Sequence, residues 1–252
     1  MMKGVEAIGV SYSVGSREII HDITFELEEG KVLAILGPNG VGKTTLLRIL
    51  SGIIPPSRGK VYLYGENPAK FRRFLTYIPA NYNIDMYARS LDIMLAELYN
   101  GGFFYNRRDI EKIRMWASYF GVERYFDTPF GKLSSGEQKL VLLAGGLARD
   151  PKIMILDEPT AFLDISNQAK ILSLIREIAE KEGITIVFAL HEIYYGNIAD
   201  YVMLMKDGKL IKFGNPNEVL NKDLLVGIYG IELEGFEING SKVFLPKFSK
   251  SS

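Results

Sequence analysis

A glycine-rich stretch at residues 37–45 carries the strongest sign of chemistry in this sequence. It fits the pattern G-x-x-x-x-G-K-[ST] and comprises Gly37, Pro38, Asn39, Gly40, Val41, Gly42, Lys43, Thr44 and Thr45. Glycines let backbone N–H groups converge on phosphate oxygens, and the helix expected to follow adds partial positive charge at its N-terminus. In such a loop Lys43 reaches the β- and γ-phosphates of a nucleotide, and the Thr44 hydroxyl binds Mg²⁺.

The residues on either side of the loop decide between a phosphate site and a glycine-rich turn that binds nothing. Residues 32–36, Val-Leu-Ala-Ile-Leu, form the continuous apolar run that is typical of a parallel strand buried on both faces. Residues 45–50 have a helical apolar pattern that Gly52 ends. A strand before the loop and a helix after it are the context that the pattern requires, so the sequence predicts nucleotide binding.

Two adjacent carboxylates follow a second apolar run. Asp157 and Glu158 come directly after residues 153–156, Ile-Met-Ile-Leu. In an open parallel sheet ligands bind beyond the carboxyl ends of the strands, so both acids should face the phosphates. Asp157 then suits the Mg²⁺ shell, directly or through water, and Glu158 suits a general base that polarises the attacking water. The pattern is weak alone and becomes persuasive together with the phosphate loop.

A helix start at residues 133–138 offers a second anion site. The sequence there is Leu-Ser-Ser-Gly-Glu-Gln, in which Ser134 and Glu137 match a capping box. One interpretation is a well-capped helix with no further role. The other is that Ser134 and the Gly136 backbone bind a phosphate that this chain's own loop does not hold.

Length and composition restrict the class of protein. The chain has 252 residues, 47% hydrophobic and 24% charged, which is ordinary for a globular protein with an ample core. Thirty basic residues balance thirty acidic ones, so charge gives no general attraction to nucleic acid, and the absence of cysteine excludes disulfides and thiol chemistry. We expect neither a signal peptide nor a membrane span, so any role at a membrane would require a partner.

The remaining pattern predicts the elements that position these groups. Apolar alternation or buried runs favour strands over residues 5–12, 23–27, 61–64, 74–79, 153–156, 184–190, 201–205 and 210–213. Asp207-Gly208 is a strong hairpin signal between the last two strands. After Gly230, residues 231–233 and 243–245 form short alternating stretches that precede a polar end.

The stretch between about residues 80 and 149 is helical in pattern and interrupts the α/β order. Two sets of apolar residues lie at helical spacing, namely Leu91, Met94, Leu95 and Leu98, then Ile110, Ile113, Ala117 and Phe120. A helix is also expected before Gly183, and a basic cluster near residues 107–114 favours a solvated face. We therefore predict a nucleotide-binding α/β core over residues 1–79 and 150–230, a helical lobe over 80–149 and a short tail over 231–252.

Together these motifs resemble those of ATP-binding cassette (ABC) ATPases. Residues 133–138 resemble the family's signature motif and lie just upstream of the strand that carries the two acids. Ala161-Phe162-Leu163-Asp164 looks like the D-loop, and His191, at a strand end, looks like the switch histidine. Tyr12 lies where the family stacks an aromatic ring on adenine. The resemblance covers about residues 4–230.

The resemblance implies a P-loop NTPase core with a mainly parallel sheet, an N-terminal antiparallel β subdomain and an inserted α-helical lobe. It implies ATP and Mg²⁺ as cofactors, and a head-to-tail dimer in which one chain's phosphate loop and the other's signature helix hold each ATP. It gives catalytic roles to Lys43, Glu158 and His191, and Mg²⁺ binding to Thr44 and Asp157. Further nucleotide contacts would come from Tyr12, Ser134, Ser135, Gly136, Glu137 and Asp164.

Within the family, residues 163–168 and 219–231 look most like importers of iron chelates, haem and cobalamin. This implies the energy-supplying subunit of a membrane transporter, bound through permease subunits to the cytoplasmic face of the cell membrane. An extracytoplasmic solute-binding protein would act through the permease, and no nucleic-acid partner is expected. Residues 82–105 are rich in Tyr and Phe and would dock on the permease, or else belong to the core of the helical lobe.

Two positions depart from the family pattern. Ser135 replaces a more usual glycine in the signature, a small change that we expect to be tolerated. Ala80 stands where the Q-loop glutamine usually helps to bind Mg²⁺ and senses the membrane partner. Asn81 is adjacent, but successive residues of an extended segment point to opposite sides, so water is the favoured replacement ligand.

Two other functional classes fit part of the pattern. A non-transport ABC ATPase acting on DNA or the ribosome usually has long coiled-coil insertions or two cassettes, and this chain has neither. A nucleotide-dependent switch without hydrolysis is suggested by Ala80 alone, and the presence of Lys43, Asp157 and Glu158 argues against it. The transported solute cannot be identified from this chain, because other chains would handle it.

Overall fold

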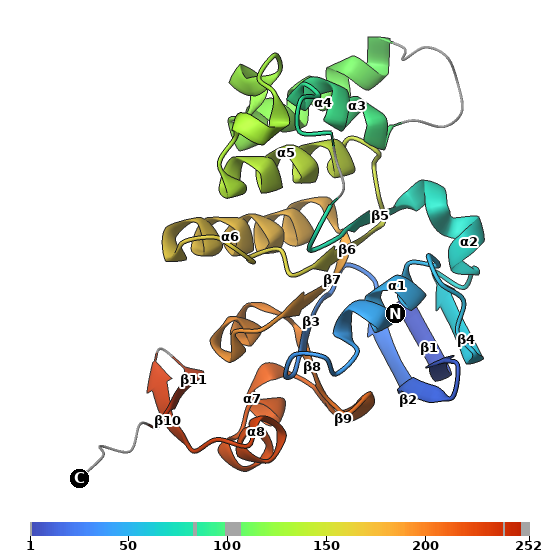
Figure 1. The fold of residues 1–252 in the computed structure, drawn as a ribbon, viewed down its shortest axis with the longest axis vertical. Helices are drawn as coiled ribbons and strands as arrows, with labels where there is room; N and C mark the ends of the chain where they lie inside the picture. Colours follow the sequence, from blue (N-terminus) through green and yellow to red (C-terminus); the bar gives the residue numbers. More distant parts are fainter. Residues whose placement is uncertain (1, 83–84, 99–106, 239, 248–252) are drawn as a thin grey trace.

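The structure is a computed structural model, and it describes residues 2–82, 85–98, 107–238 and 240–247. A six-stranded sheet with the order β5-β6-β7-β3-β8-β9 lies at its centre (Figure 1). Neighbouring strands run parallel up to β8, and β9 is antiparallel to β8. The strands are β3 (Val32–Leu36), β5 (Leu75–Ile78), β6 (Ile153–Asp157), β7 (Thr185–Leu190), β8 (Tyr201–Lys206) and β9 (Lys209–Gly214).

The central strands bury side chains on both faces of this sheet. Val32, Ala34 and Leu36 of β3 pack into one hydrophobic core, whereas Leu33 and Ile35 pack into the other. Because successive strand residues point to opposite faces, only a continuous apolar run fills both cores. The buried parallel strand predicted before the phosphate loop is therefore confirmed.

A second, antiparallel sheet covers one side of the molecule. Its order is β2-β1-β4, with β1 (Lys3–Val14), β2 (Arg17–Glu28) and β4 (Arg58–Leu63). Helix α1 (Lys43–Leu50) lies between this sheet and the central one (Figure 1). The N-terminal antiparallel subdomain is confirmed, and its inward residues, among them Val5, Phe25 and Leu27, fill the core that α1 shares.

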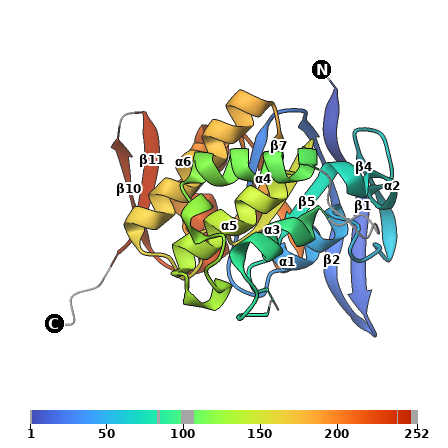
Figure 2. The ribbon, with the colours of Figure 1, turned by 90° about the horizontal axis from the view of Figure 1, so that it is seen from above.

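The opposite side carries the helices of the inserted lobe. These are α3 (Ser90–Glu97), α4 (Arg107–Phe120) and α5 (Ser135–Leu147), and α6 (Ile165–Glu182) lies between them and the sheet in Figure 1. Figure 2 views these helices crossing in front of the strands. Their predicted apolar faces supply Met94, Ile113, Ala117 and Phe120 to the core. The predicted fold class is confirmed, and the exact domain boundaries stay a prediction.

The C-terminal region contains elements that the sequence did not predict. They are the helices α7 (Pro216–Val219) and α8 (Lys222–Tyr229), and α2 (Pro68–Phe71) was likewise missed earlier in the chain. Single turns of 3₁₀ helix occupy residues 72–74, 123–125 and 130–132, and a longer one spans 193–198. Each α-helix named here is short and is capped by an Asn side chain, Asn67, Asn215 or Asn221.

The expected alternating stretches of the tail form an antiparallel hairpin. Strand β10 (Leu233–Ile238) pairs with β11 (Ser241–Pro246) and packs against residues 193–198, where Asn197 Nδ2 donates to Lys242 O at 2.8 Å. The first stretch was wrongly placed. Gly230 ends α8 in the left-handed conformation, so Ile231 still leads out of the helix and the strand begins only at Leu233.

Two turn predictions are confirmed. Gly183 ends α6 with a φ of 65°, and Asp207-Gly208 joins β8 to β9 as a hairpin. Among the residues described, no helix is long and apolar enough to cross a membrane. The basic residues at the start of α4 are solvated as expected, and Arg107 pairs with Glu111 at 2.9 Å.

Candidate active site

The phosphate loop connects β3 to α1 in a conformation that demands glycine. Gly37 has a φ of 154° and Gly42 a φ of 101°, both disfavoured for residues with a Cβ. A Cβ at Gly37 would lie 2.3 Å from Met205 O, and one at Gly42 would lie 2.7 Å from Ile20 Cδ1. Substitution at either position would therefore displace the loop and the backbone N–H groups that it presents.

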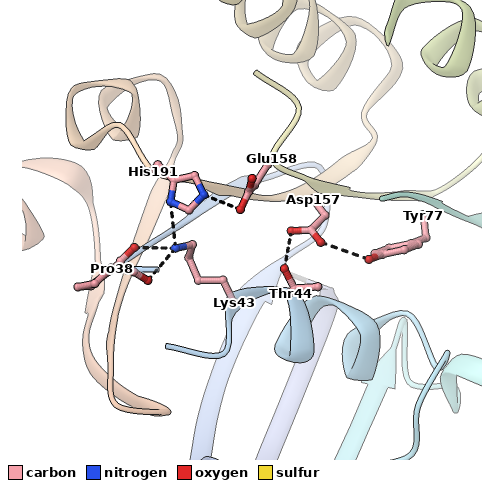
Figure 3. Close-up of polar contacts among 8 residues, drawn as sticks. Pro38, Lys43, Thr44, Tyr77, Asp157, Glu158 and His191 are labelled. Carbon is pink, nitrogen blue, oxygen red and sulfur yellow. Dashed lines mark hydrogen bonds and ion pairs between the residues drawn. The ribbon is translucent and has the colours of Figure 1, made fainter. Parts of the chain in front are cut away.

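Lys43 begins α1, and its side chain turns back over the loop. Its ammonium donates to Gly37 O at 2.6 Å and to Pro38 O at 3.1 Å, and it lies 3.5 Å from His191 Nδ1 (Figure 3). Burial lowers the pKa of this ammonium, and the charges of Glu158 and Asp157 oppose the shift. The loop carbonyls thus hold a desolvated cation at the position where phosphate oxygens would replace them.

Thr44 and Asp157 meet at the end of β6. Thr44 Oγ1 donates to Asp157 Oδ1 at 3.1 Å, and the Tyr77 hydroxyl lies 3.5 Å from Asp157 Oδ2 (Figure 3). Burial raises the pKa of the Asp157 carboxyl, while the Thr44 hydrogen bond opposes the shift. Sequence reasoning placed the first two residues together and missed Tyr77. Only the pairing of β5 with β6 brings that ring to the carboxylate.

Glu158 and His191 lie in contact beyond the ends of β6 and β7. Glu158 Oε1 is 2.5 Å from His191 Nε2, while Nδ1 of the same ring faces Lys43. Both contacts are satisfied when Nε2 carries the proton and Nδ1 accepts. Glu158 has a φ of 49°, a strained conformation for a residue other than glycine. Such strain is typical of functional sites, and here it belongs to the expected general base.

Lys43, Thr44 and the Glu158–His191 pair line one pocket of about 750 Å³, a size suited to a small ligand. Most of the phosphate loop, Glu158 and His191 are in its wall, together with residues that sequence reasoning missed, namely Arg17, Glu18, Ile19, Asp207 and Gly208. His21 also lines it. Its backbone N–H donates to Gly208 O at 2.9 Å, a contact between β2 and the β8–β9 turn that a single sequence cannot reveal.

Thr44 in the pocket wall and Asp157 beside it fit Mg²⁺. Thr44 and Asp157 present hydroxyl and carboxylate oxygens side by side, and these are the hard donors that Mg²⁺ prefers. Mg²⁺ typically takes one or two protein oxygens and completes its shell with phosphate oxygens and water. Bound there, it would neutralise charge on the β- and γ-phosphates.

The expected signature residues lie apart from this pocket. Ser134 caps α5 in the predicted capping box, with its hydroxyl 2.9 Å from Glu137 Oε2. Asp164 caps α6 by accepting from Asn167 N at 2.8 Å. None of the pocket-lining residues comes from 134–137 or 164.

The two capped helix starts touch each other. A Cβ on Gly136 would lie 3.1 Å from the Asn167 side chain, so the signature glycine packs directly against the start of α6. Beside them Phe162 is 82% exposed and Ile165 is 78% exposed. We call this surface the signature face. It consists of residues 134–137 and 161–167.

Three further positions considered in the sequence, Tyr12, Ala80 and Asn81, lie outside the pocket wall. Tyr12 stands opposite Ile20 in the β1–β2 ladder and is half-buried, and it does not line the pocket. Ala80 is half-buried, whereas Asn81 is exposed and outside the pocket wall. The adenine-stacking role of Tyr12 stays a prediction, and the exposure of Asn81 favours water over its side chain as a replacement ligand. The aromatic stretch 82–105 falls partly outside the described residues.

The family described as ABC transporter matches this chain over residues 20–161, which include the phosphate loop and both acids. The ferric enterobactin transport ATP-binding protein FepC of Escherichia coli is 31% identical over 230 residues, covering 86% of this chain and 83% of FepC. This chain belongs to the ABC transporter family. The family assignment made from the motifs is therefore confirmed.

Solved ABC structures extend the match to the whole architecture. An ABC transporter assigned to the metal-chelate type, in an inward-facing conformation, aligns with a TM-score of 0.87 and 26% identity over 98% of each chain. A dimeric post-hydrolysis ATP-binding cassette bound to ADP and phosphate aligns with a TM-score of 0.73 and 25% identity, over 84% of this chain and 98% of that one. The ABC subunit described here is accordingly a nucleotide-binding ATPase whose hydrolysis is coupled to transport.

Proposed function

We propose that this ABC subunit hydrolyses Mg²⁺-bound ATP in a site that two copies of the chain build head to tail, and that it drives uptake of a metal chelate or a cobalamin-like solute. The observation that carries the proposal is the convergence of Lys43, Glu158 and His191 on one pocket that Thr44 also lines. Lys43 lies 3.5 Å from His191, His191 lies 2.5 Å from Glu158, and Thr44 contacts Asp157 at 3.1 Å. The signature face lies outside that pocket, so a second copy would have to supply it.

Each residue of the pocket has a role in this reaction. Lys43 would exchange its loop carbonyls for β- and γ-phosphate oxygens, and Thr44 with Asp157 would hold the metal. Glu158 would accept the proton of the attacking water as general base. His191 is placed to orient Glu158, because its Nε2 already contacts that carboxylate at 2.5 Å. Burial of the cluster strengthens each of these electrostatic contacts.

The second copy would contribute its signature face. Ser134 and the Gly136 backbone stand at the N-terminus of a 13-residue helix, where N–H groups and the helix dipole favour an anion. The exposed Phe162 and Ile165 beside them suit a surface that another chain covers. The dimeric cassette with ADP and phosphate supports this arrangement by its 25% identity and shared fold.

Membrane permease subunits are the partners through which ATP hydrolysis would drive transport. FepC is by name a ferric enterobactin transport subunit, and the inward-facing structure is assigned to a metal-chelate transporter, which supports a chelated metal as the cargo. Within the described part of the aromatic stretch, Tyr87 is 89% exposed and Met86 is 47% exposed, as a docking surface requires. The subunit would lie at the cytoplasmic face of the membrane, and a solute-binding protein would deliver the cargo from outside.

Reconstitution with the cognate permease tests this function. The complex that co-purifies from native membranes is placed in liposomes with ATP inside, with a ferric siderophore or cobalamin and any solute-binding protein outside. We expect uptake of one class of solute, dependent on ATP and Mg²⁺, and none with a Glu158→Gln complex. Co-purification with a nucleic-acid or ribosomal particle and no membrane protein would overturn the transport role.

A further inference from the structure

A strained turn begins at Glu158 and ends on the signature face. Phe162 has a φ of 64°, in the left-handed region that residues with a Cβ rarely adopt, and its ring is 82% exposed. Glu158, at the other end of the turn, is also left-handed, with a φ of 49°. Such conformations persist only where the surrounding structure fixes them, so the contacts that hold this turn carry information about its role.

One side chain of α6 holds the end of the turn. Gln168 Nε2 donates to Leu163 O at 3.1 Å, and the Leu163 side chain is buried in the core. The oxygen of the same amide accepts from the Tyr195 hydroxyl at 2.8 Å. A side-chain amide has an acceptor oxygen and a donor nitrogen, and here each has a different partner. Gln168 therefore links Tyr195 to the turn.

Tyr195 belongs to the 3₁₀ segment at residues 193–198, which follows His191. Its ring is half-buried and packs against the core. The start of the turn is attached to the same region, because Glu158 N donates to Ala189 O at 3.2 Å, just before His191. Both ends of the turn are thus attached to the chain around His191, one before this residue and one after it.

We propose that Tyr195 is a positioning residue that acts through Gln168 and fixes the turn of Phe162 and Leu163 in the shape that a second copy of the chain contacts. The inference rests on the proposed function, which assigns the signature face to the interface between two copies. The inner side of the turn has half-buried hydrogen bonds and its outer side has an exposed ring, as a rigid contact requires. The shape of the interface then depends on the segment that follows His191.

Preorganisation of the turn determines the expected effect. A turn already held in its bound shape associates at little entropic cost, whereas a loosened turn must be ordered when the second copy binds. Neither Tyr195 nor Gln168 lines the pocket that contains the phosphate loop. Loss of their hydrogen bond should therefore weaken ATP-driven association of two copies and leave ATP binding by a single chain unchanged.

Tyr195→Phe removes the hydroxyl and keeps the ring. We place it in a Glu158→Gln background, which prevents hydrolysis, and measure dimer formation with ATP by analytical ultracentrifugation. The chain concentration for half-maximal dimer formation should rise about tenfold, and the ATP dissociation constant of the monomer should change less than about twofold. Tyr62→Phe, the same substitution at a half-buried position of β4, should change neither quantity.

A double-mutant cycle tests the route through Gln168. Gln168→Leu should weaken dimer formation as much as Tyr195→Phe, and the two changes together should add little further. Gln168→Glu keeps an oxygen that accepts from Tyr195 and loses the donor to Leu163 O, so it should behave like Gln168→Leu. Simple addition of the two single effects, or dimer formation at the level of the background chain in Gln168→Glu, would overturn the proposal.

Thermal unfolding separates positioning from stabilisation of the fold. If Tyr195 only stabilises the fold, Tyr195→Phe lowers Tm and leaves dimer formation at the level of the Tyr62→Phe control, and that result would overturn the proposal. If Tyr195→Phe does not fold, Gln168→Glu tests the same link by the same criterion. Failure of the Glu158→Gln chain to dimerise with ATP while Tyr195 is intact would instead contradict the proposed head-to-tail site.

Discussion

The pocket and the signature face are built in opposite ways. At the pocket, side chains that are distant in sequence meet in pairs: Lys43 contacts His191, and His191 contacts Glu158. Thr44 in the same wall contacts Asp157. In the pocket, charged side chains contact each other across the chain fold. On the signature face, Ser134 and Asp164 instead bond to the first turn of their own helices. In the proposed dimer, each ATP site needs both regions.

The largest effect should come from replacing Glu158, the proposed general base in the pocket. Glu158→Gln keeps the shape and the contact with His191 but removes proton acceptance, so hydrolysis should fall by about 10² or more while ATP still binds. Because bound ATP is then not hydrolysed, a dimer of the chain should accumulate, detectable as a doubling of mass in light scattering. Glu123→Gln, at an exposed site on the helical lobe, is the matched control. Turnover within threefold of wild type would remove Glu158 from the role of base.

Breaking the signature face should separate hydrolysis from nucleotide affinity. Ser134→Arg places a bulky cation at the start of α5, so we expect loss of hydrolysis with little change in the ATP dissociation constant of the monomer. Lys43→Ala, by comparison, should weaken both because it belongs to the pocket. Ser118→Arg is a control of equal size at an exposed position on α4. A parallel loss of monomer affinity in Ser134→Arg would mean that the signature face belongs to the chain's own site.

A smaller effect concerns the metal shell at the edge of the pocket. Because Asn81 is exposed and outside the pocket wall, Asn81→Ala should leave the Mg²⁺ concentration for half-maximal turnover within about twofold of wild type. Ala80→Gln should lower that concentration if the loop can present an amide. A large increase for Asn81→Ala in a Mg²⁺ titration would identify Asn81 as the ligand. Absence of Mg²⁺-stimulated turnover in the wild-type complex would contradict hydrolysis itself.

The smallest effect is on stability of the nucleotide-free chain. Burial raises the folded-state pKa of Asp157, so the folded chain holds this proton more tightly than the unfolded one. Its ionisation therefore destabilises the fold above the folded-state pKa. The penalty disappears as pH falls below the unfolded value of about 4. Asp157→Asn should raise Tm by at most a few degrees near neutral pH, with the difference closing in acid. A Tm difference between Asp157→Asn and wild type that grows as pH falls would contradict a raised pKa of Asp157 in the folded chain.

Sequence predicts the signature face better than it predicts the pocket walls. The capping box of Ser134 and the cap of Asp164 are local, and the patterns around them suffice. The Thr44–Asp157 contact was also expected, because strand ends of a parallel sheet share one edge. Tyr77 and the left-handed conformation of Glu158 were not, since both depend on how β5, β6 and β7 pair. The hairpin after Gly230 was only half predicted because short strands have weak periodicity.

Lys139 illustrates the same limit. In the sequence it is one more polar residue of α5, and only the tertiary packing shows that its side chain is buried, with Nζ 5.5 Å from the centre of the Tyr82 ring. Arg17, Glu18 and His21 entered the pocket for a comparable reason. Their strand belongs to the antiparallel sheet, and its approach to the phosphate loop is a tertiary contact without a motif.

Proximity between the phosphate loop of one copy and the signature face of another tests the account most directly. The chain has no cysteine, so Asn39→Cys in one copy and Ser135→Cys in the other, each with Glu158→Gln, provide a single reactive pair at exposed positions. A short bifunctional thiol reagent should join the two copies when ATP and Mg²⁺ are present, and much less without ATP. Linkage that is independent of ATP, or found only between two Ser135→Cys copies, would contradict a site shared head to tail.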